Sequence, residues 1–174
     1  MNWPNRLSIF RILCIPFIVV FLSLSASWCR WAALAVFALG SFSDFLDGHL
    51  ARKNGWVTTF GKFIDPVADK LLVLSTLVML VSLNLIPAWM VILILARELS
   101  VDGLRMIAVS QGKVIAAGPL GKIKTTSQMI LILVLLAFPR FVFSFPAGIA
   151  LGAWVCAITL WSGIDYFVRN RDVF

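Results

Sequence analysis

The stretch that decides the fold is Asp44-Phe45-Leu46-Asp47-Gly48-His49-Leu50-Ala51-Arg52, followed after eight residues by Gly61-Lys62-Phe63-Ile64-Asp65-Pro66-Val67-Ala68-Asp69. It holds four of the eight carboxylates of a 174-residue chain in which 61% of the residues are hydrophobic. Ionisable side chains at membrane depth are costly unless they are paired, hydrated or bound to metal, so they mark a functional site. The four aspartates are therefore the first candidates for function.

Helical spacing would bring these carboxylates together. Asp44 and Asp47 are three residues apart, and Gly61, Asp65 and Asp69 are four apart, so each set shares one helix face. If the two helices are antiparallel neighbours, the four carboxylates converge on one pocket. Their hard oxygen atoms suit Mg²⁺ or Mn²⁺, with Ca²⁺ as an alternative. The structural alternative is a set of salt bridges to nearby cations, namely Arg52, Lys62, Lys70 or Arg97.

The composition indicates that the bilayer is the solvent. The mean hydropathy is +0.99 and only 13% of the residues are charged, which is more apolar surface than a soluble domain of this size could bury. A net charge of +7 is explained better by membrane topology and by anionic lipids or phosphate substrates than by nucleic acid. Without a repeat or linker, residues 1–174 are expected to form one domain. The three cysteines (Cys14, Cys29, Cys156) show neither metal nor disulfide spacing.

Six apolar runs predict six transmembrane helices. A full span needs about 20 residues, and the four middle runs reach that length only by including a polar neighbour. With six alternating spans, these polar extensions fall on one side of the membrane. The expected fold is therefore an all-α membrane protein, a six-helix bundle with a polar cavity at one end. The runs cover residues 7–26, 31–43, 71–83, 86–96, 129–138 and 145–164.

The distribution of Lys and Arg predicts the orientation of the bundle. Eleven of the fifteen lie in one set of loops and chain ends, whereas the other set carries two, Arg30 and Arg140. By the positive-inside rule, both termini and the cavity should face the cytoplasm. The eleven are Arg6, Arg11, Arg52, Lys53, Lys62, Arg105, Lys113, Lys122, Lys124, Arg169 and Arg171.

Small and basic residues beside the aspartates suit a phosphate-bearing ligand. Gly48 and Gly61 leave room for a bulky group, although small residues also serve close helix packing. Arg52 offers a planar fork of donors for phosphate oxygens. Pro66 predicts a kink or a helix start directly after Asp65.

A second, basic cluster follows further along the chain. Its members are Arg97, Arg105, Lys122 and Lys124, and the segment 118–121 precedes a helix whose N-terminal donors favour an anion. We expect this cluster to bind the phosphate of a small acceptor. The alternatives are topological anchoring or lipid contact, and for Arg97 an ion pair with Glu98 or Asp102.

These motifs resemble those of a known enzyme family. The pattern D-x2-DG-x2-AR-x8-G-x3-D-x3-D, filled at every fixed position of residues 44–69, is identified as that of the CDP-alcohol phosphotransferases. The start at residues 2–7 with Arg11, and the segment 96–125, resemble the bacterial branch that makes phosphatidylglycerophosphate. This resemblance implies phosphatidyl transfer from CDP-diacylglycerol to sn-glycerol 3-phosphate, with release of CMP, in phospholipid biosynthesis at the cytoplasmic membrane.

The resemblance also implies roles for single residues. The metal ligands would be Asp44, Asp47, Asp65 and Asp69, holding two Mg²⁺ or Mn²⁺ ions, with Asp69 also as the base. These two roles of Asp69 compete, because a carboxylate that binds metal is a poorer base. A homodimer is implied as well, and Gly148 and Gly152 could provide a contact for it. The residues expected to bind CDP-diacylglycerol are Asp44, Asp47, Gly48, Ala51, Arg52 and Gly61.

Two other functions stay open. A different acceptor, such as serine, inositol phosphate or phosphatidylglycerol, is the nearest alternative, and the basic cluster argues for a phosphorylated one. A divalent-cation transporter is the alternative from another class, since intramembrane carboxylates also mark ion pathways. Against it, the carboxylates gather at one end of the bundle, and Leu, Val and Ile fill the outer halves of the helices.

Overall fold

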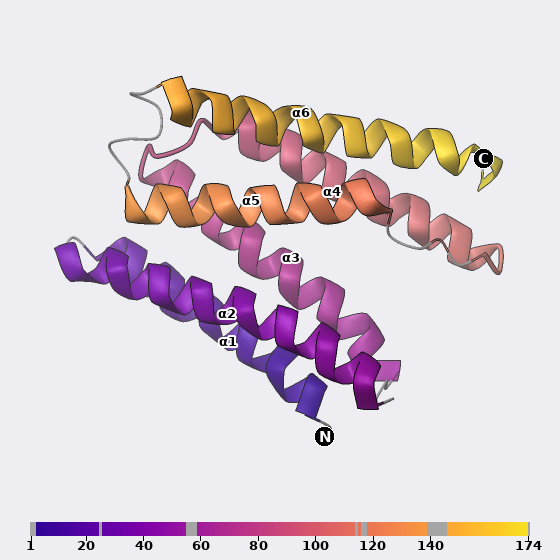
Figure 1. Ribbon diagram of the computed structural model, residues 1–174, viewed down its shortest axis with the longest axis horizontal. Helices are drawn as coiled ribbons and strands as arrows, with labels where there is room; N and C mark the ends of the chain where they lie inside the picture. The colour runs from indigo at the N-terminus through magenta and orange to yellow at the C-terminus, as the bar shows by residue number, and fades with distance from the viewer. Residues whose placement is uncertain are drawn as a thin grey trace.

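The computed structural model describes the backbone of residues 3–24, 26–54, 59–113, 115, 118–138 and 146–173, and the side chains of 7–24, 26–43, 64–113, 115, 118–138 and 147–173. The described residues form six α-helices and one short 3₁₀ helix, so the all-α class is confirmed for this part of the chain (Figure 1). The elements are α1 (Trp3–Ser23), α2 (Ser27–Asn54), α3 (Thr59–Ser82), α4 (Ala88–Ser110), α5 (Pro119–Ala137), α6 (Pro146–Arg169) and η1 (Arg171–Val173).

Each helix runs antiparallel to the one before it (Figure 1). Helix α1 packs on α2 and α3, α5 packs on α6 and α2, and α4 packs on α6. Helix α3 crosses between the α1–α2 pair and the other three helices (Figure 1). The expected neighbours α2 and α3 are in contact. Alternation therefore places the N-terminal halves of α1, α3 and α5 at the same end as the C-terminal halves of α2, α4 and α6.

Two tight turns allow these reversals. Each turn contains one residue in the left-handed conformation: Asn84 (φ 56°) after α3 and Gly112 (φ 73°) after α4. In both turns this residue donates its N–H to the carbonyl three residues back, and the next residue donates to the carbonyl five back. This Schellman pattern satisfies the last carbonyls of the helix and ends it abruptly. Gly and Asn tolerate the positive φ that the pattern requires.

An apolar core fills the end of the bundle opposite the polar residues. Helix α2 approaches α3 closely at Gly40, where an added Cβ would lie 2.9 Å from a Leu72 methyl group. The core takes residues from every helix, so the outer end of the bundle is filled by packed side chains, as expected from the Leu, Val and Ile there. Ile18, Phe37, Leu77, Ile94, Leu131 and Val155, one per helix, are each no more than 1% exposed.

The outer surface of the helices is also strongly apolar. Large hydrophobic side chains that are more than 40% exposed occur on all six helices, for example Phe17, Trp31, Val78, Ile92, Ile130 and Ile164. Soluble proteins rarely expose so much apolar surface, whereas lipid contact requires it. Among the described residues, Pro119–Ala137 of α5 and Ala147–Arg169 of α6 are long and apolar enough to cross a membrane, and Leu7–Ser23 of α1 is a shorter apolar segment.

The structure changes three local expectations. Helix α3 begins at Thr59, so Pro66 lies inside it; of the two alternatives for Pro66, a helix start is excluded and a kink stays a prediction. Helix α5 begins at Pro119, because the N-cap Gly118 is extended (φ −74°, ψ 164°) and proline suits the first helical position. Gly148 and Gly152 are both buried within the bundle, so this pair packs inside the chain and does not form an exposed dimer contact.

Candidate active site

A cavity of about 720 Å³ lies among the polar ends of the helices. Its lining comes from the N-terminal and middle turns of α3 and α5, from the middle and C-terminal turns of α4, from Tyr166 of α6 and from Ser41 of α2. The antiparallel order of the helices brings these segments to the same end of the bundle. The cavity therefore collects polar residues from Ser41 to Tyr166, which are 125 positions apart in sequence.

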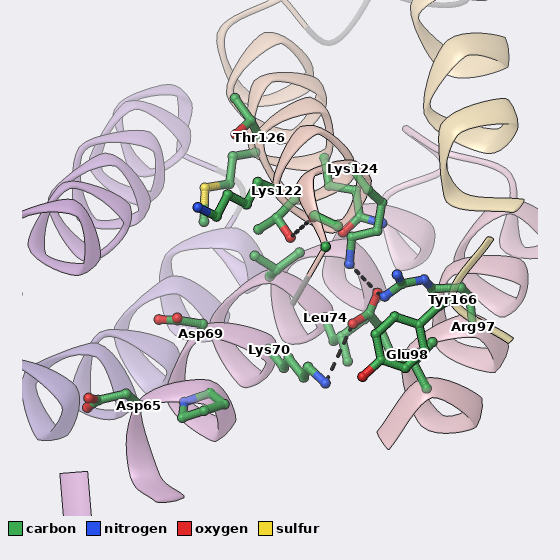
Figure 2. A pocket seen from close by; sticks show the side chains of 18 of the residues that line it. Asp65, Asp69, Lys70, Leu74, Arg97, Glu98, Lys122, Lys124, Thr126 and Tyr166 are labelled. Atoms are coloured by element: carbon green, nitrogen blue, oxygen red, sulfur yellow. Dashed lines mark hydrogen bonds and ion pairs between the residues drawn. The ribbon is translucent and has the colours of Figure 1, made fainter. Parts of the chain in front are cut away.

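One wall of the cavity is acidic. Asp65 and Asp69 lie on the same face of α3 and both line the cavity, as their spacing of four predicts (Figure 2). Ser8 Oγ donates a hydrogen bond to Asp65 Oδ1, and Arg11 Nη1 forms an ion pair with Asp69 Oδ1. Ser8 and Arg11 both belong to α1 and are 0% exposed. Helix α1 thus holds both carboxylates of α3 in place.

The expected partners of these carboxylates lie outside the described side chains. They are Asp44, Asp47, Gly48, Ala51, Arg52 and Gly61. The backbone is helical to Asn54, so Asp44 and Asp47 do lie on one helix, at the polar end of α2. Among the described residues, no group of three or more His, Cys, Asp or Glu could hold a metal ion. Asp65 and Asp69 thus form the described part of the expected set of four.

The second wall is a charge network around Glu98 of α4 (Figure 2). Lys124 Nζ bonds to Glu98 Oε1, Arg97 Nη1 lies 3.3 Å from the same oxygen, and Lys70 Nζ lies 3.7 Å from Oε2. Lys70 also bonds to Asp102 Oδ1 on the next turn of α4. Glu98 is 5% exposed and Lys124 is 4% exposed. Cations from three helices therefore surround one buried carboxylate.

Tyr166 of α6 holds Arg105 at the edge of this wall. The Nε of Arg105 donates a hydrogen bond to the Tyr166 hydroxyl at 2.8 Å, and its guanidinium carbon lies 5.4 Å from the ring centroid. Tyr166 is itself buried beside Val101 and Val173. This bond uses Nε, so the donors that Arg105 can offer to an anion in the cavity are its two terminal guanidinium nitrogens.

The N-terminus of α5 adds further positive character. Gly118 and Gly121 line the cavity, and a Cβ added at either would meet nothing within 4 Å, so the backbone there is open to a ligand. The first turn of a helix carries N–H groups without intrahelical partners and a partial positive charge. Lys122 lines the cavity from this turn and is exposed. This end of the cavity suits an anion such as phosphate.

The cavity therefore joins two kinds of chemistry. The acidic wall can accept a proton or supply hard oxygen ligands to a divalent cation. The basic wall can bind a phosphate through charge-assisted hydrogen bonds. The charged lining residues among the described side chains are five cations and three carboxylates, namely Lys70, Arg97, Arg105, Lys122 and Lys124 with Asp65, Asp69 and Glu98.

Comparison with known proteins decides the family. Residues 1–162 match the family model described as CDP-alcohol phosphatidyltransferase. The chain belongs to this family. It is 42% identical over 187 aligned residues to the CDP-diacylglycerol–glycerol-3-phosphate 3-phosphatidyltransferase of Bacillus subtilis (strain 168), with 98% of this chain and 96% of the relative covered. Relatives of the same name in Escherichia coli (strain K12) and Salmonella choleraesuis (strain SC-B67) are each 37% identical, with 98% and 95% covered.

In this CDP-alcohol phosphatidyltransferase, the structure brings six of the expected site residues to one cavity: Asp65, Asp69, Arg97, Arg105, Lys122 and Lys124. Sequence reasoning assigned no functional role to Ser8, Arg11 or Tyr166, and considered Glu98 only as a partner of Arg97. One signal was present, because Arg11 interrupts an apolar run and an ionisable residue there needs a partner. Arg11 forms an ion pair with Asp69, and it was not among the expected salt-bridge partners.

Proposed function

We propose that this protein transfers the phosphatidyl group of CDP-diacylglycerol to sn-glycerol 3-phosphate, giving phosphatidylglycerophosphate and CMP. The observation that carries the proposal is the cavity in which Asp65 and Asp69 share one space with Arg105 and Lys124. Similarity over nearly the whole chain to enzymes that bear this activity in their names supports the same substrates.

In the proposed reaction, an acceptor hydroxyl oxygen attacks the phosphorus that carries the diacylglycerol. A new oxygen–phosphorus bond forms, the bond to CMP breaks, and the hydroxyl proton passes to the carboxylate of Asp69. Asp69 is suited to this role because it lines the cavity, its side chain is 26% exposed, and Arg11 fixes its orientation. Most of the acceleration would come from positioning and from electrostatic stabilisation of the transferred group.

The basic wall would hold the phosphate of the acceptor. Arg105 presents a planar fork whose Nε is already fixed by Tyr166, and Lys122 and Lys124 add charge beside the open N-terminus of α5. A phosphate would complement the excess of cations at this wall, whereas serine would not. Arg97 would contribute from its position beside Glu98.

We further propose that the aspartates hold a divalent metal, as two Mg²⁺ or Mn²⁺ ions. Asp65 and Asp69 fit this role because they offer carboxylate oxygens from one helix face to the cavity. Asp44 and Asp47 would complete the set, and the nucleotide would also contact Gly48, Ala51, Arg52 and Gly61. Bound there, the ions would polarise the diphosphate and offset the charge of the departing CMP.

The setting that we propose is the bacterial cytoplasmic membrane. All six helices would cross it, with both termini and the cavity on the cytoplasmic side, and the protein would act as a homodimer. Exposed apolar side chains on every helix support contact with membrane lipids. The eleven-to-two distribution of Lys and Arg supports the orientation.

A divalent-cation transporter has less support. Beyond the cavity, the described part of the bundle is filled by core side chains such as Phe37 and Leu77, which are fully buried. A transported ion would have to cross this apolar layer.

The decisive experiment measures CMP release by the purified protein with CDP-diacylglycerol, Mg²⁺ and a panel of acceptors. We expect release with glycerol 3-phosphate and far less with serine, inositol phosphate or phosphatidylglycerol. Preference for another acceptor would overturn the substrate assignment. No release with any acceptor would overturn the proposed activity.

A further inference from the structure

Glu98 takes no chemical part in the reaction proposed above, yet it is the centre of the basic wall. Its side chain is 6% exposed, and the side chains of Lys124 and Arg97 around it are 5% and 10% exposed. A buried ion pair is a poor source of stability, because apolar residues of the same volume often serve as well or better. The presence of a carboxylate here therefore calls for an explanation in terms of the site.

The geometry around Glu98 supplies that explanation. Oε1 is shared by Lys124 and Arg97, while Oε2 lies 3.7 Å from Lys70 Nζ. Lys124 of α5 and Arg97 of α4 meet at the same Glu98 oxygen, whereas Lys70 of α3 also bonds to Asp102. Without the charge of Glu98, like charges in a poorly hydrated site would push Lys124 and Arg97 apart.

Arg97 is positioned from a second direction by α6. A Cβ added at Gly163 would lie 3.1 Å from Arg97 Cγ, so the missing side chain makes room for the stem of the arginine. The Nε of Arg97 is buried and has no hydrogen-bond partner among the described residues. Arg97 is thus a cavity-lining cation with an unused buried donor, held between Glu98 and the backbone of α6.

We propose that Glu98 is a positioning residue for the acceptor site: it holds Lys124 and Arg97 in the arrangement that binds the acceptor phosphate. This rests on the proposed function in one respect, that the acceptor is phosphorylated. A competing role makes the opposite prediction. If Glu98 merely competed with the phosphate for Lys124, its removal would tighten acceptor binding.

The first test is Glu98→Gln, which keeps the size of the side chain and removes its charge. We expect the KM for glycerol 3-phosphate to rise about tenfold, the loss typical of one charge-assisted contact, while the KM for CDP-diacylglycerol stays nearly unchanged. Glu98→Asp should recover part of the loss, because it restores the charge on a shorter side chain. An unchanged or lower acceptor KM in Glu98→Gln overturns the proposal.

The matched control is Asp165→Asn in α6. Asp165 pairs at 2.8 Å with Arg169, whose side chain is 64% exposed, so this variant loses a carboxylate outside the cavity. Both KM values should stay as in the unchanged protein. A rise in acceptor KM equal to that of Glu98→Gln would show a general effect of charge and overturn the proposal.

The second test moves Arg97 without changing any charge. Gly163→Ala would press on the stem of Arg97 and should also raise the acceptor KM, whereas Gly103→Ala, where nothing lies within 4 Å, should not. If Gly163→Ala leaves the acceptor KM unchanged, the proposed role of Arg97 in binding the acceptor phosphate is overturned. Neither variant removes a buried charge, so this test does not depend on Glu98→Gln folding.

The third test asks whether Glu98 acts through Lys124. In a double-mutant cycle with Lys124→Gln, the effect on acceptor KM should be smaller than the product of the two single effects. The double variant also removes both members of the buried pair, which favours its folding over that of either single variant. Fully multiplicative effects would mean that Glu98 acts independently of Lys124, and would overturn the proposal.

A binding measurement separates this proposal from the proposed function. Glycerol 3-phosphate without donor should raise the Tm of the purified protein and should raise it much less in Glu98→Gln. If the unchanged protein is protected in this way but releases no CMP, the proposed function fails and the role of Glu98 stands. If it releases CMP and Glu98→Gln is protected equally, the role of Glu98 fails and the proposed function stands.

Discussion

Arg11 of α1 forms an ion pair with Asp69 of α3, 58 positions away in the sequence, and the arginine side chain is fully buried. The pair joins the first helix to the carboxylate that we propose as the base. Removing one partner of a buried pair leaves a charge without compensation and costs about 3–5 kcal/mol when both are fully buried. Since the side chain of Asp69 is 26% exposed, water would lower this cost.

We therefore expect Arg11→Met to destabilise the protein and to impair CMP release. Arg11→Lys, which keeps the charge but not the planar fork, should show an intermediate effect. The measurements are thermal unfolding in detergent and turnover at saturating substrates. Unfolding and turnover as in the unchanged protein would show that the contact contributes to neither.

The second prediction concerns the metal. Replacing Asp44, Asp47 or Asp65 by Asn should reduce turnover by a factor of about a thousand, since a lost ligand removes several kcal/mol of transition-state stabilisation. Excess chelator should abolish activity, and added Mg²⁺ or Mn²⁺ should restore it. Full activity of Asp65→Asn, with normal metal dependence, would contradict the assignment.

The third prediction concerns the acceptor phosphate. Arg105→Ala and Lys124→Ala should each raise the KM for glycerol 3-phosphate about ten- to a hundredfold, because each loses a charge-assisted contact of about 1.5–3 kcal/mol. The donor KM should change little, and Arg105→Lys should recover only part of the loss. Arg52→Ala should instead raise the donor KM. Saturation curves for both substrates, measured for each variant, test this. If the acceptor curves of Arg105→Ala and Lys124→Ala are unchanged, the basic cluster contacts lipid or anchors the topology and does not bind the acceptor.

The fourth prediction isolates the hydrogen bond between Tyr166 and Arg105. Tyr166→Phe keeps the ring and removes the hydroxyl that accepts from Arg105 Nε at 2.8 Å. A net contribution of about 0.5–1.5 kcal/mol corresponds to a rise of roughly two- to tenfold in the acceptor KM. Trp161→Phe, at a residue of α6 that is 66% exposed, is the control and should leave this KM unchanged. If Tyr166→Phe behaves like the control, the hydroxyl does not position Arg105.

The fifth prediction concerns orientation. Tags at both termini should be cytoplasmic, because eleven Lys and Arg lie on that side against two on the other. Single cysteines introduced near Lys53 and Lys113 should be protected from impermeant thiol reagents in intact cells and should react after lysis. Efficient labelling of both sites in intact cells would reverse the orientation.

The sequence by itself determined the class of the protein and the local geometry of its site. Asp65 and Asp69 share the cavity-lining face of α3 because a spacing of four brings residues to one side of any helix, whatever it packs against. The alternation of six helices likewise predicted that their polar halves would meet at one end. The start of α5 was predicted too late, although Pro119 carries a signal for it, since proline favours the first helical position.

Only the tertiary structure decided which polar side chains meet. Arg11 pairs with Asp69, Lys124 with Glu98 and Arg105 with Tyr166, across 58, 26 and 61 positions of sequence. These partners depend on how each helix is rotated and shifted along its neighbour. Helical periodicity defines the faces of one helix but leaves that rotation and shift undetermined. For the same reason, the sequence could not show that Gly148 and Gly152 lie inside the bundle, because a small-residue face fits a neighbour in the same chain as well as one in another.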